Sequence, residues 1–290
     1  MRSFADYNPV AVAVYFFSIS IAAMFTMDPV VLALSLTGGV CYFLMRNGLQ
    51  NGRAHLFSLL LFGITALINP LMSHKGQTVL FVMNHNPVTL EALLYGLAAG
   101  GMIVSTLYWF RSFSQIMTSD KLLYIFAFLS PRLSLLFSMT LRYVPLFQAQ
   151  WKKVRQAQTA LGLYKDDNFI DSCRGGLRVF SVMITWALEN GIITADSMTA
   201  RGYGIGRRSH FSLFRWKKGD IALLLGSVAL LGLTLWATKL RSFSYYPAVT
   251  AASLDLRILL GYAACFLLSF LPTIIHVKEV LKWRCLQSNM

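Results

Sequence analysis

Long apolar runs with few charges dominate the chain, and short polar breaks separate them. A membrane-spanning helix needs about 20 mostly apolar residues. Six segments meet this requirement, at residues 10–27, 29–45, 56–72, 88–110, 221–238 and 258–275. Asp28-Pro29 predicts a tight turn between the first two segments, and Asn69-Pro70 ends the third. The pattern therefore predicts a polytopic all-α membrane bundle of about six spans.

The fourth apolar run contains Gly96, Gly100 and Gly101. Small residues at this spacing let a neighbouring helix approach closely, so we expect a tight helix contact there. Residues 122–147 are also apolar, but Pro131-Arg132 and Arg142 interrupt them. A charge at mid-membrane depth is expensive, and the segment is too short for two crossings. It predicts two short helices packed against the bundle near the cytoplasmic interface.

Composition narrows the class of protein. Of the 290 residues, 56% are hydrophobic and 13% are charged, and the mean hydropathy is +0.57. Soluble domains carry about 25% charged residues, so disordered, fibrous and ordinary soluble classes are excluded. The first apolar run lacks a cleavage site and is expected to be a span, not a removed signal. The four cysteines are scattered without a CxxC pair, so neither a zinc or haem signature nor a disulfide framework is predicted.

The net charge of +14 reports on orientation. With the N-terminus in the cytoplasm, 20 of the 26 Lys and Arg residues lie on that side and 4 on the other, with Arg132 and Arg142 completing the total. Cytoplasmic loops carry the excess of basic residues, so both termini are expected inside. The basic residues fall in short loops, so a nucleic-acid partner is not predicted.

Residues 148–219 form the only long polar segment, and they carry two stripes of helical spacing. The first stripe is Val144, Phe147, Trp151, Val154, Gln158 and Leu161, in which only Gln158 is polar; the second is Phe180, Met183, Ile184, Ala187, Gly191, Ala195 and Met198. Gly162 and Gly202 stand where helix C-terminal glycines belong. We expect two long amphipathic helices joined by a linker around residues 163–178. Such helices could lie on the bilayer surface or dock on proteins.

Three motifs carry a family resemblance. They are Leu141-Arg142-Tyr143-Val144-Pro145, Arg155-Gln156-Ala157-Gln158-Thr159-Ala160-Leu161-Gly162 and Ala195-Asp196-Ser197-Met198-Thr199-Ala200-Arg201-Gly202-Tyr203. With Asn8-Pro9, Asn69-Pro70 and Thr118-Ser119-Asp120, they resemble the T component of energy-coupling factor (ECF) transporters, the EcfT/CbiQ-like family of ABC-type importers of vitamins and metal ions. The resemblance runs from about residue 8 to residue 220.

The resemblance implies a non-catalytic scaffold without a cofactor in the plasma membrane of a prokaryote. Its implied partners, besides membrane lipid, are two EcfA-type ABC ATPases and a membrane S component that captures the substrate. The apolar runs and the polar segment divide the chain into three expected parts: N-terminal spans at 1–121, a coupling region at 122–219 and a C-terminal hairpin at 220–290.

The resemblance also implies roles for individual residues. The ATPase-docking motifs are Ala160, Leu161 and Gly162 at the end of one long helix and Ala200, Arg201 and Gly202 at the end of the other. Contacts between the long helices and with the S component are implied for Trp151, Val154, Phe180, Met183, Ala187, Gly191, Ala195 and Met198, and a structural role for Arg142, Tyr143 and Pro145. Leu161 departs from the family, which has Arg at this position, so the two docking ends are expected to be unequal.

A membrane enzyme and a self-contained secondary transporter remain alternatives. Against an enzyme, the sequence has no Walker A loop, G-x-S-x-G or H-E-x-x-H motif. Against a secondary transporter, internal repeats are not visible and the spans contain almost no ionisable residue. His74 and His85 could form a weak metal site, but interface residues without a ligand are favoured and no metal is predicted. Asp166-Asp167 could be an acid pair, but solvation of the linker is favoured.

Overall fold

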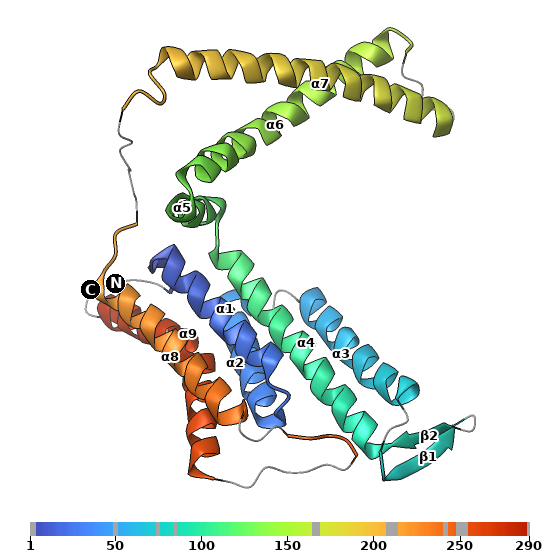
Figure 1. The fold of residues 1–290 in the computed structure, drawn as a ribbon, viewed down its shortest axis with the longest axis vertical. Helices are drawn as coiled ribbons and strands as arrows, with labels where there is room; N and C mark the ends of the chain where they lie inside the picture. The colour runs from blue at the N-terminus through green and yellow to red at the C-terminus, as the bar shows by residue number, and fades with distance from the viewer. Residues whose placement is uncertain are drawn as a thin grey trace. The chain divides into compact units, whose positions relative to one another are not determined.

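The computed structural model describes residues 4–48, 52–73, 76–83, 86–163, 169–206, 214–239, 243–247 and 255–288. His74, His85 and the pair Asp166-Asp167 lie outside these ranges. Within them the elements follow in this order: η1 (Phe4–Asp6), α1 (Pro9–Phe25), α2 (Pro29–Asn47), α3 (Gly52–Met72), β1 (Val79–Met83), β2 (Asn86–Thr89), α4 (Leu90–Ile116), α5 (Ser119–Leu129), α6 (Pro131–Ala160), α7 (Phe169–Ala200), α8 (Lys218–Lys239) and α9 (Leu256–Ser288) (Figure 1).

The six predicted spans correspond to α1, α2, α3, α4, α8 and α9. Five of these are long and apolar enough to cross a membrane, and α1, with 17 residues, is a shorter apolar helix. The predicted turn at Asp28-Pro29 is confirmed, because Asp28 is the N-cap of α2. Between α3 and α4 the chain forms a two-stranded antiparallel hairpin, in which Phe81 pairs with Val88 and Met83 with Asn86.

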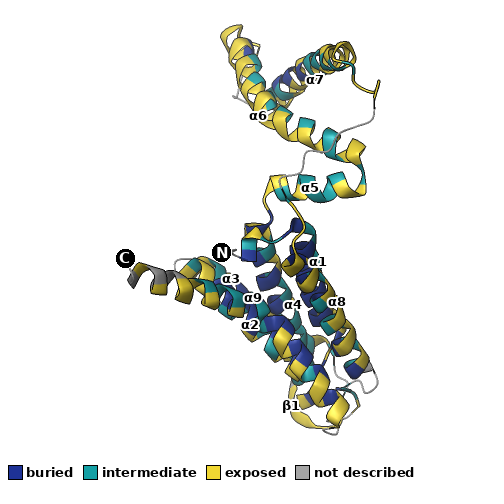
Figure 2. Cartoon of the chain, turned by 90° about the vertical axis from the view of Figure 1, so that its left-hand side faces the viewer, coloured by how far each residue is buried: buried dark blue, intermediate teal, exposed yellow. Residues whose placement is uncertain are grey.

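The spanning helices belong to one compact unit, Met1–Leu122 with Phe214–Met290. Neighbours in this unit follow a ring in which α1 packs on α8, α8 on α9, α9 on α2, α2 on α4 and α4 on α1, while α3 packs on α4. Figure 2 shows buried residues along the inner faces of these helices and exposed ones on the outer faces. Outward apolar side chains suit a lipid environment, since lipid tails are as apolar as they are.

The core of the bundle is aromatic and is fixed by buried hydrogen bonds. Tyr15 and Trp109 are almost fully buried, with their ring centroids 6.3 Å apart. The Tyr15 hydroxyl donates to the carbonyl of Leu268 at 2.6 Å, and Trp109 Nε1 donates to Ser35 Oγ at 3.1 Å. The first bond joins α1 to α9 and the second joins α4 to α2. Separating either pair of helices would leave an unpaired polar group in an apolar interior, which is costly.

The Asn-Pro motifs act as local anchors. The Asn8 side chain caps α1 by accepting a hydrogen bond from the Val10 backbone amide at 3.0 Å. The backbone amide of Asn8 donates to Asp220 Oδ1 at 3.2 Å. Asn69 Nδ2 donates to the Ala92 carbonyl at 2.9 Å and so ties α3 to α4.

At the far end of α4, Lys121 donates to the Ile116 carbonyl at 3.0 Å. Burial there lowers the pKa of the Lys121 ammonium.

Gly96 and Gly100 confirm the expected close contact on α4. A Cβ at Gly96 would lie 2.7 Å from the Ala66 carbonyl oxygen, and one at Gly100 would lie 2.8 Å from Thr65 Oγ1. Both of these neighbours belong to α3. Gly101 takes no part in the contact, since a Cβ there would meet no atom within 4 Å.

Candidate functional site

The second compact unit, Leu123–Leu213, contains the two longest polar helices. The α6 helix has 30 residues and α7 has 32, so each is about 45 to 50 Å long at 1.5 Å per residue. Both helices were predicted, and both are longer than expected. The expected short helix after Pro131 is the beginning of α6, which continues through Pro145. The linker between the two helices is shorter than expected, because α7 already begins at Phe169.

The start of α7 explains why the linker was predicted too long. Gly175 and Gly176 weaken the helical pattern in the sequence, because glycine is a poor helix former. In the structure Gly175 is buried within α7, as is Val179 one turn later. A helix propensity this low is overridden when tertiary packing buries the segment.

Side chains near the middle of α6 join it to α7. The rings of Phe147 and Trp186 meet edge to face with centroids 5.2 Å apart. The Tyr143 and Thr194 hydroxyls are 2.6 Å apart in a hydrogen bond, and Thr194 Oγ1 also donates to the Asn190 carbonyl at 2.7 Å. Tyr143 of the predicted structural motif therefore links the two helices, a contact that spacing alone did not assign. An aromatic pair and a hydrogen bond together set the register of one helix against the other.

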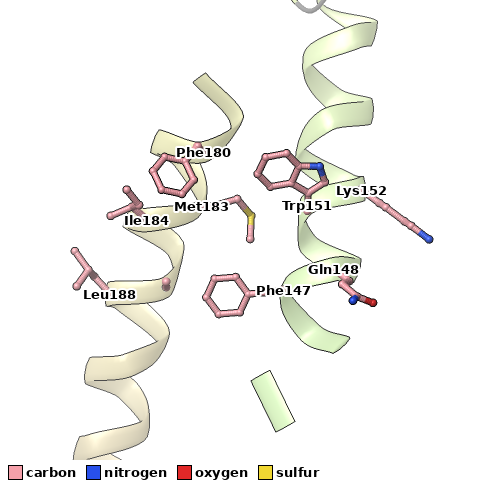
Figure 3. A pocket seen from close by; sticks show the side chains of 9 residues that line it. Phe147, Gln148, Trp151, Lys152, Phe180, Met183, Ile184 and Leu188 are labelled. Atoms are coloured by element: carbon pink, nitrogen blue, oxygen red, sulfur yellow. The ribbon is translucent and has the colours of Figure 1, made fainter. Parts of the chain in front are cut away.

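An apolar groove of about 590 Å³ lies between α6 and α7. In Figure 3, Phe147, Trp151 and Met183 point into the space between the helices, whereas Lys152 extends away from it. Met183 is 3% exposed, but Trp151 is 38% exposed. The groove is lined by Phe147, Gln148, Trp151, Lys152, Phe180, Met183, Ile184, Ala187 and Leu188.

The predicted stripe on α7 divides between two faces. Met183 is buried, and Ala187 and Met198 are half-buried, as is Val154 on α6. Phe180, Gly191 and Ala195 are exposed. A Cβ at Gly191 would meet no atom within 4 Å, so the implied contact of Gly191 with the other long helix is absent. The helices instead meet at larger side chains, those of Phe147 and Trp186.

An exposed apolar face runs along α7, and the predicted stripe covers only part of it. Its large members are 46% to 65% exposed, and they recur every three or four residues: Leu177, Phe180, Ile184 and Leu188. Their spacing places them on one side of the helix. Contiguous exposed apolar surface of this kind marks a site of protein or membrane contact. The signal in the sequence was present, because Leu177 and Leu188 extend the Phe180–Ile184 period.

The two long helices end in the same backbone geometry. Gly162 has φ +70° and Gly202 has φ +79°, the left-handed conformation that favours glycine. The Gly162 amide donates to the Thr159 carbonyl and the Leu163 amide to the Gln158 carbonyl, both at 3.0 Å.

The second end repeats this pair of bonds. The Gly202 amide donates to the Thr199 carbonyl at 2.9 Å and the Tyr203 amide to the Met198 carbonyl at 3.0 Å. Both ends are Schellman caps, which confirms the predicted helix-terminating role of Gly162 and Gly202.

Each cap presents one side chain just before its glycine. Leu161 is 72% exposed, and Arg201 is exposed, as are Ala160 and Ala200. Equivalent backbone geometry thus displays an apolar group at one end and a guanidinium at the other. Gln158, three residues before Leu161, is 8% exposed, although it was the polar exception in the predicted stripe. In the part of the chain that the structure describes, no cluster of His, Cys, Asp or Glu could hold a metal ion.

The fold and these helices define a polytopic helical membrane protein, with a helical bundle for the bilayer and a helix pair that displays two capped ends. The sequence matches the cobalt transport protein family, CbiQ, over residues 2–212. The chain belongs to this family, and its similarity to curated relatives supports a T component of an ECF transporter. A membrane component of this family is not itself catalytic, so a membrane enzyme is not supported.

Curated relatives carry the name energy-coupling factor transporter transmembrane protein EcfT. The protein from Listeria innocua is 28% identical over an alignment of 222 residues, and the match covers 71% of this chain and 80% of that protein. EcfT 1 from Listeria monocytogenes is 28% identical over 91 residues, 31% of this chain and 34% of the relative. EcfT from Lactobacillus helveticus is 28% identical over 117 residues, 40% of this chain and 42% of the relative. These similarities support a prokaryotic membrane protein.

Proposed function

We propose that this chain is the scaffold of an ECF importer that links two cytoplasmic ABC ATPases of the EcfA type to a membrane S component. The observation that carries the proposal is the pair of matching helix caps, at Gly162 and Gly202, on two long joined helices. Each cap would enter a groove on one ATPase. ATP hydrolysis would take place in those partners.

The unequal caps favour two different docking modes. Arg201 follows the last residue of α7, where the helix dipole favours a cation, and its planar fork can pair bidentately with a partner carboxylate. Leu161 offers only apolar area. This difference suits a pair of non-identical ATPases, with Ala160 and Ala200 keeping each end narrow.

The S component would pack on the exposed apolar face of α7, around Phe180, Gly191 and Ala195. The contacts Phe147–Trp186 and Tyr143–Thr194 join α6 to α7, so movement of either ATPase would reach that face through both helices. The cargo would be a vitamin or a metal ion held by the S component, as the resemblance to the family implies.

Both termini and the helix pair are proposed to face the cytoplasm, with the β-hairpin outside. In a chain whose Cys173 and Cys285 are replaced by Ser, we expect an impermeant thiol reagent on intact cells to label Gln77→Cys and to leave Asp167→Cys unlabelled. Gln77 is exposed beside the hairpin. Permeabilised cells provide the control, since both positions should then react. Labelling of position 167 from outside would contradict the topology.

Purification of the tagged chain from its native membrane tests the function. We expect two ABC ATPases and one small membrane protein to accompany it, whereas recovery as a lone homo-oligomer would contradict the proposal. Gly191→Leu should weaken retention of the small membrane protein and leave both ATPases bound, because Gly191 is exposed and a Cβ there meets no atom of this chain within 4 Å. Unchanged retention and transport would remove Gly191 from that interface.

A further inference from the structure

A second cavity, of about 810 Å³, opens in the bundle where α2 and α4 end and α3 begins. Three helices contribute to it. The lining residues are Phe43 from α2, Arg53 and Ala54 from α3, and Leu107, Phe110, Arg111, Ser114 and Gln115 from α4. All of these residues belong to the first compact unit.

Arg111 is held in a fixed orientation on the wall of this cavity. Its Nη1 donates to the Ala54 carbonyl at 2.9 Å and to Ser58 Oγ at 3.1 Å. The guanidinium carbon lies 5.8 Å from the centroid of the Phe57 ring, which adds a cation–π contact. Both hydrogen bonds use Nη1, and a guanidinium has five N–H donors in a rigid fork. The fork is therefore oriented by α3 while its other donors are left for a ligand.

The cavity carries uncompensated positive charge. Arg53 and Arg111 both line it, and none of its described lining residues is Asp or Glu. The first turn of α3 adds the positive end of a helix dipole. A cleft lined by charges of one sign has a potential that attracts ions of the opposite sign. The electrostatics of the cavity thus call for an anion.

The apolar part of the lining decides what kind of anion. Leu107 and Phe110 lie on α4 within one turn of Arg111, and Phe110 is 48% exposed. Basic pockets between spanning helices are suited to acidic lipid headgroups. We propose that this cavity binds an anionic phospholipid, with its phosphate between Arg53 and Arg111 and an acyl chain along Leu107 and Phe110.

Titration of the purified full chain in detergent tests this site. The thermal midpoint is followed while dioleoyl phosphatidylglycerol is added, because a ligand that binds the folded state raises that midpoint. We expect Arg53→Gln to raise the lipid concentration needed for half the shift about tenfold, as the loss of one charge-assisted contact implies. Arg53 is exposed, so its replacement should leave the unliganded midpoint unchanged.

Lys278→Gln is the matched control, because it removes one exposed charge from α9 outside the cavity, and its titration should equal wild type. Leu107→Ala should weaken binding of dioleoyl phosphatidylglycerol and leave the response to glycerol phosphate unchanged. Equal titrations of Arg53→Gln and wild type overturn the proposal, as does an equal response to dioleoyl phosphatidylcholine. A response to glycerol phosphate as strong as to the lipid would identify a free-phosphate site instead. Each of these outcomes is independent of ATPase docking, which the isolated chain does not report.

Discussion

Replacement of Arg201 by Ala is expected to reduce docking of one ATPase about 30-fold or more. The guanidinium follows the last residue of α7 and is exposed beside a Schellman cap. Removing one partner of a buried charge pair costs about 2 to 5 kcal/mol, partly because the other charge is left unpaired. Each 1.4 kcal/mol is about a tenfold change. Co-purification of both ATPases with the variant measures the loss, and substrate uptake should fall with it.

Arg201→Lys and Leu161→Ala separate the chemistry of this docking from a general effect. Lys should restore docking only in part, because an ammonium lacks the bidentate fork. The loss in Leu161→Ala is apolar area, so it should be nearly independent of salt, whereas the contribution of Arg201 should weaken as salt rises. If Arg201→Ala recovers both ATPases as well as wild type does, at low and high salt, then Arg201 is an ordinary solvated side chain with no role in docking.

Gly96→Ala is expected to lower the free energy of unfolding of the bundle by about 1 to 3 kcal/mol, the usual penalty of overpacking. The added Cβ would lie 2.7 Å from the Ala66 carbonyl oxygen and 3.2 Å from the Asn69 Cβ. The oxygen is backbone, so α3 as a whole has to shift to relieve the contact. That shift would also disturb the hydrogen bond from Asn69 to the Ala92 carbonyl. A lower thermal midpoint of the purified chain measures the effect.

Gly101→Ala on the same helix provides the control. A Cβ there meets no atom within 4 Å, and Ala is the better helix former, so the midpoint should stay equal or rise slightly. Equal midpoints for Gly96→Ala and Gly101→Ala would mean that α3 and α4 adapt without strain. The pair separates the packing cost from helix propensity, because both substitutions change propensity alike.

The number and positions of the spanning helices could be predicted because each is encoded locally. Lipid gives the backbone no partner, so an apolar run of sufficient length must satisfy its own hydrogen bonds as a helix. The turn at Asp28 and the caps at Gly162 and Gly202 are local as well, since one proline or one left-handed residue decides each of them. The family motifs in the sequence likewise led to the assignment that the CbiQ match supports.

The extent of the long helices depended on contacts that the sequence pattern does not display. Pro145 removes one hydrogen-bond donor, yet α6 continues through it. Near this position Tyr143 and Phe147 are held against Thr194 and Trp186 of α7. Tertiary contacts of this kind outweigh a local propensity.

The candidate site shows the same division. By itself the sequence determined the two amphipathic stripes, the glycine caps and the contrast between Leu161 and Arg201, because periodicity and side-chain charge are properties of the chain alone. Only the tertiary structure decided which members of the α7 stripe meet α6, since helical spacing fixes a face but not its partner. It placed Met183 inside and left Gly191 without a neighbour, and it brought Arg53 together with Arg111 from helices that are far apart in sequence.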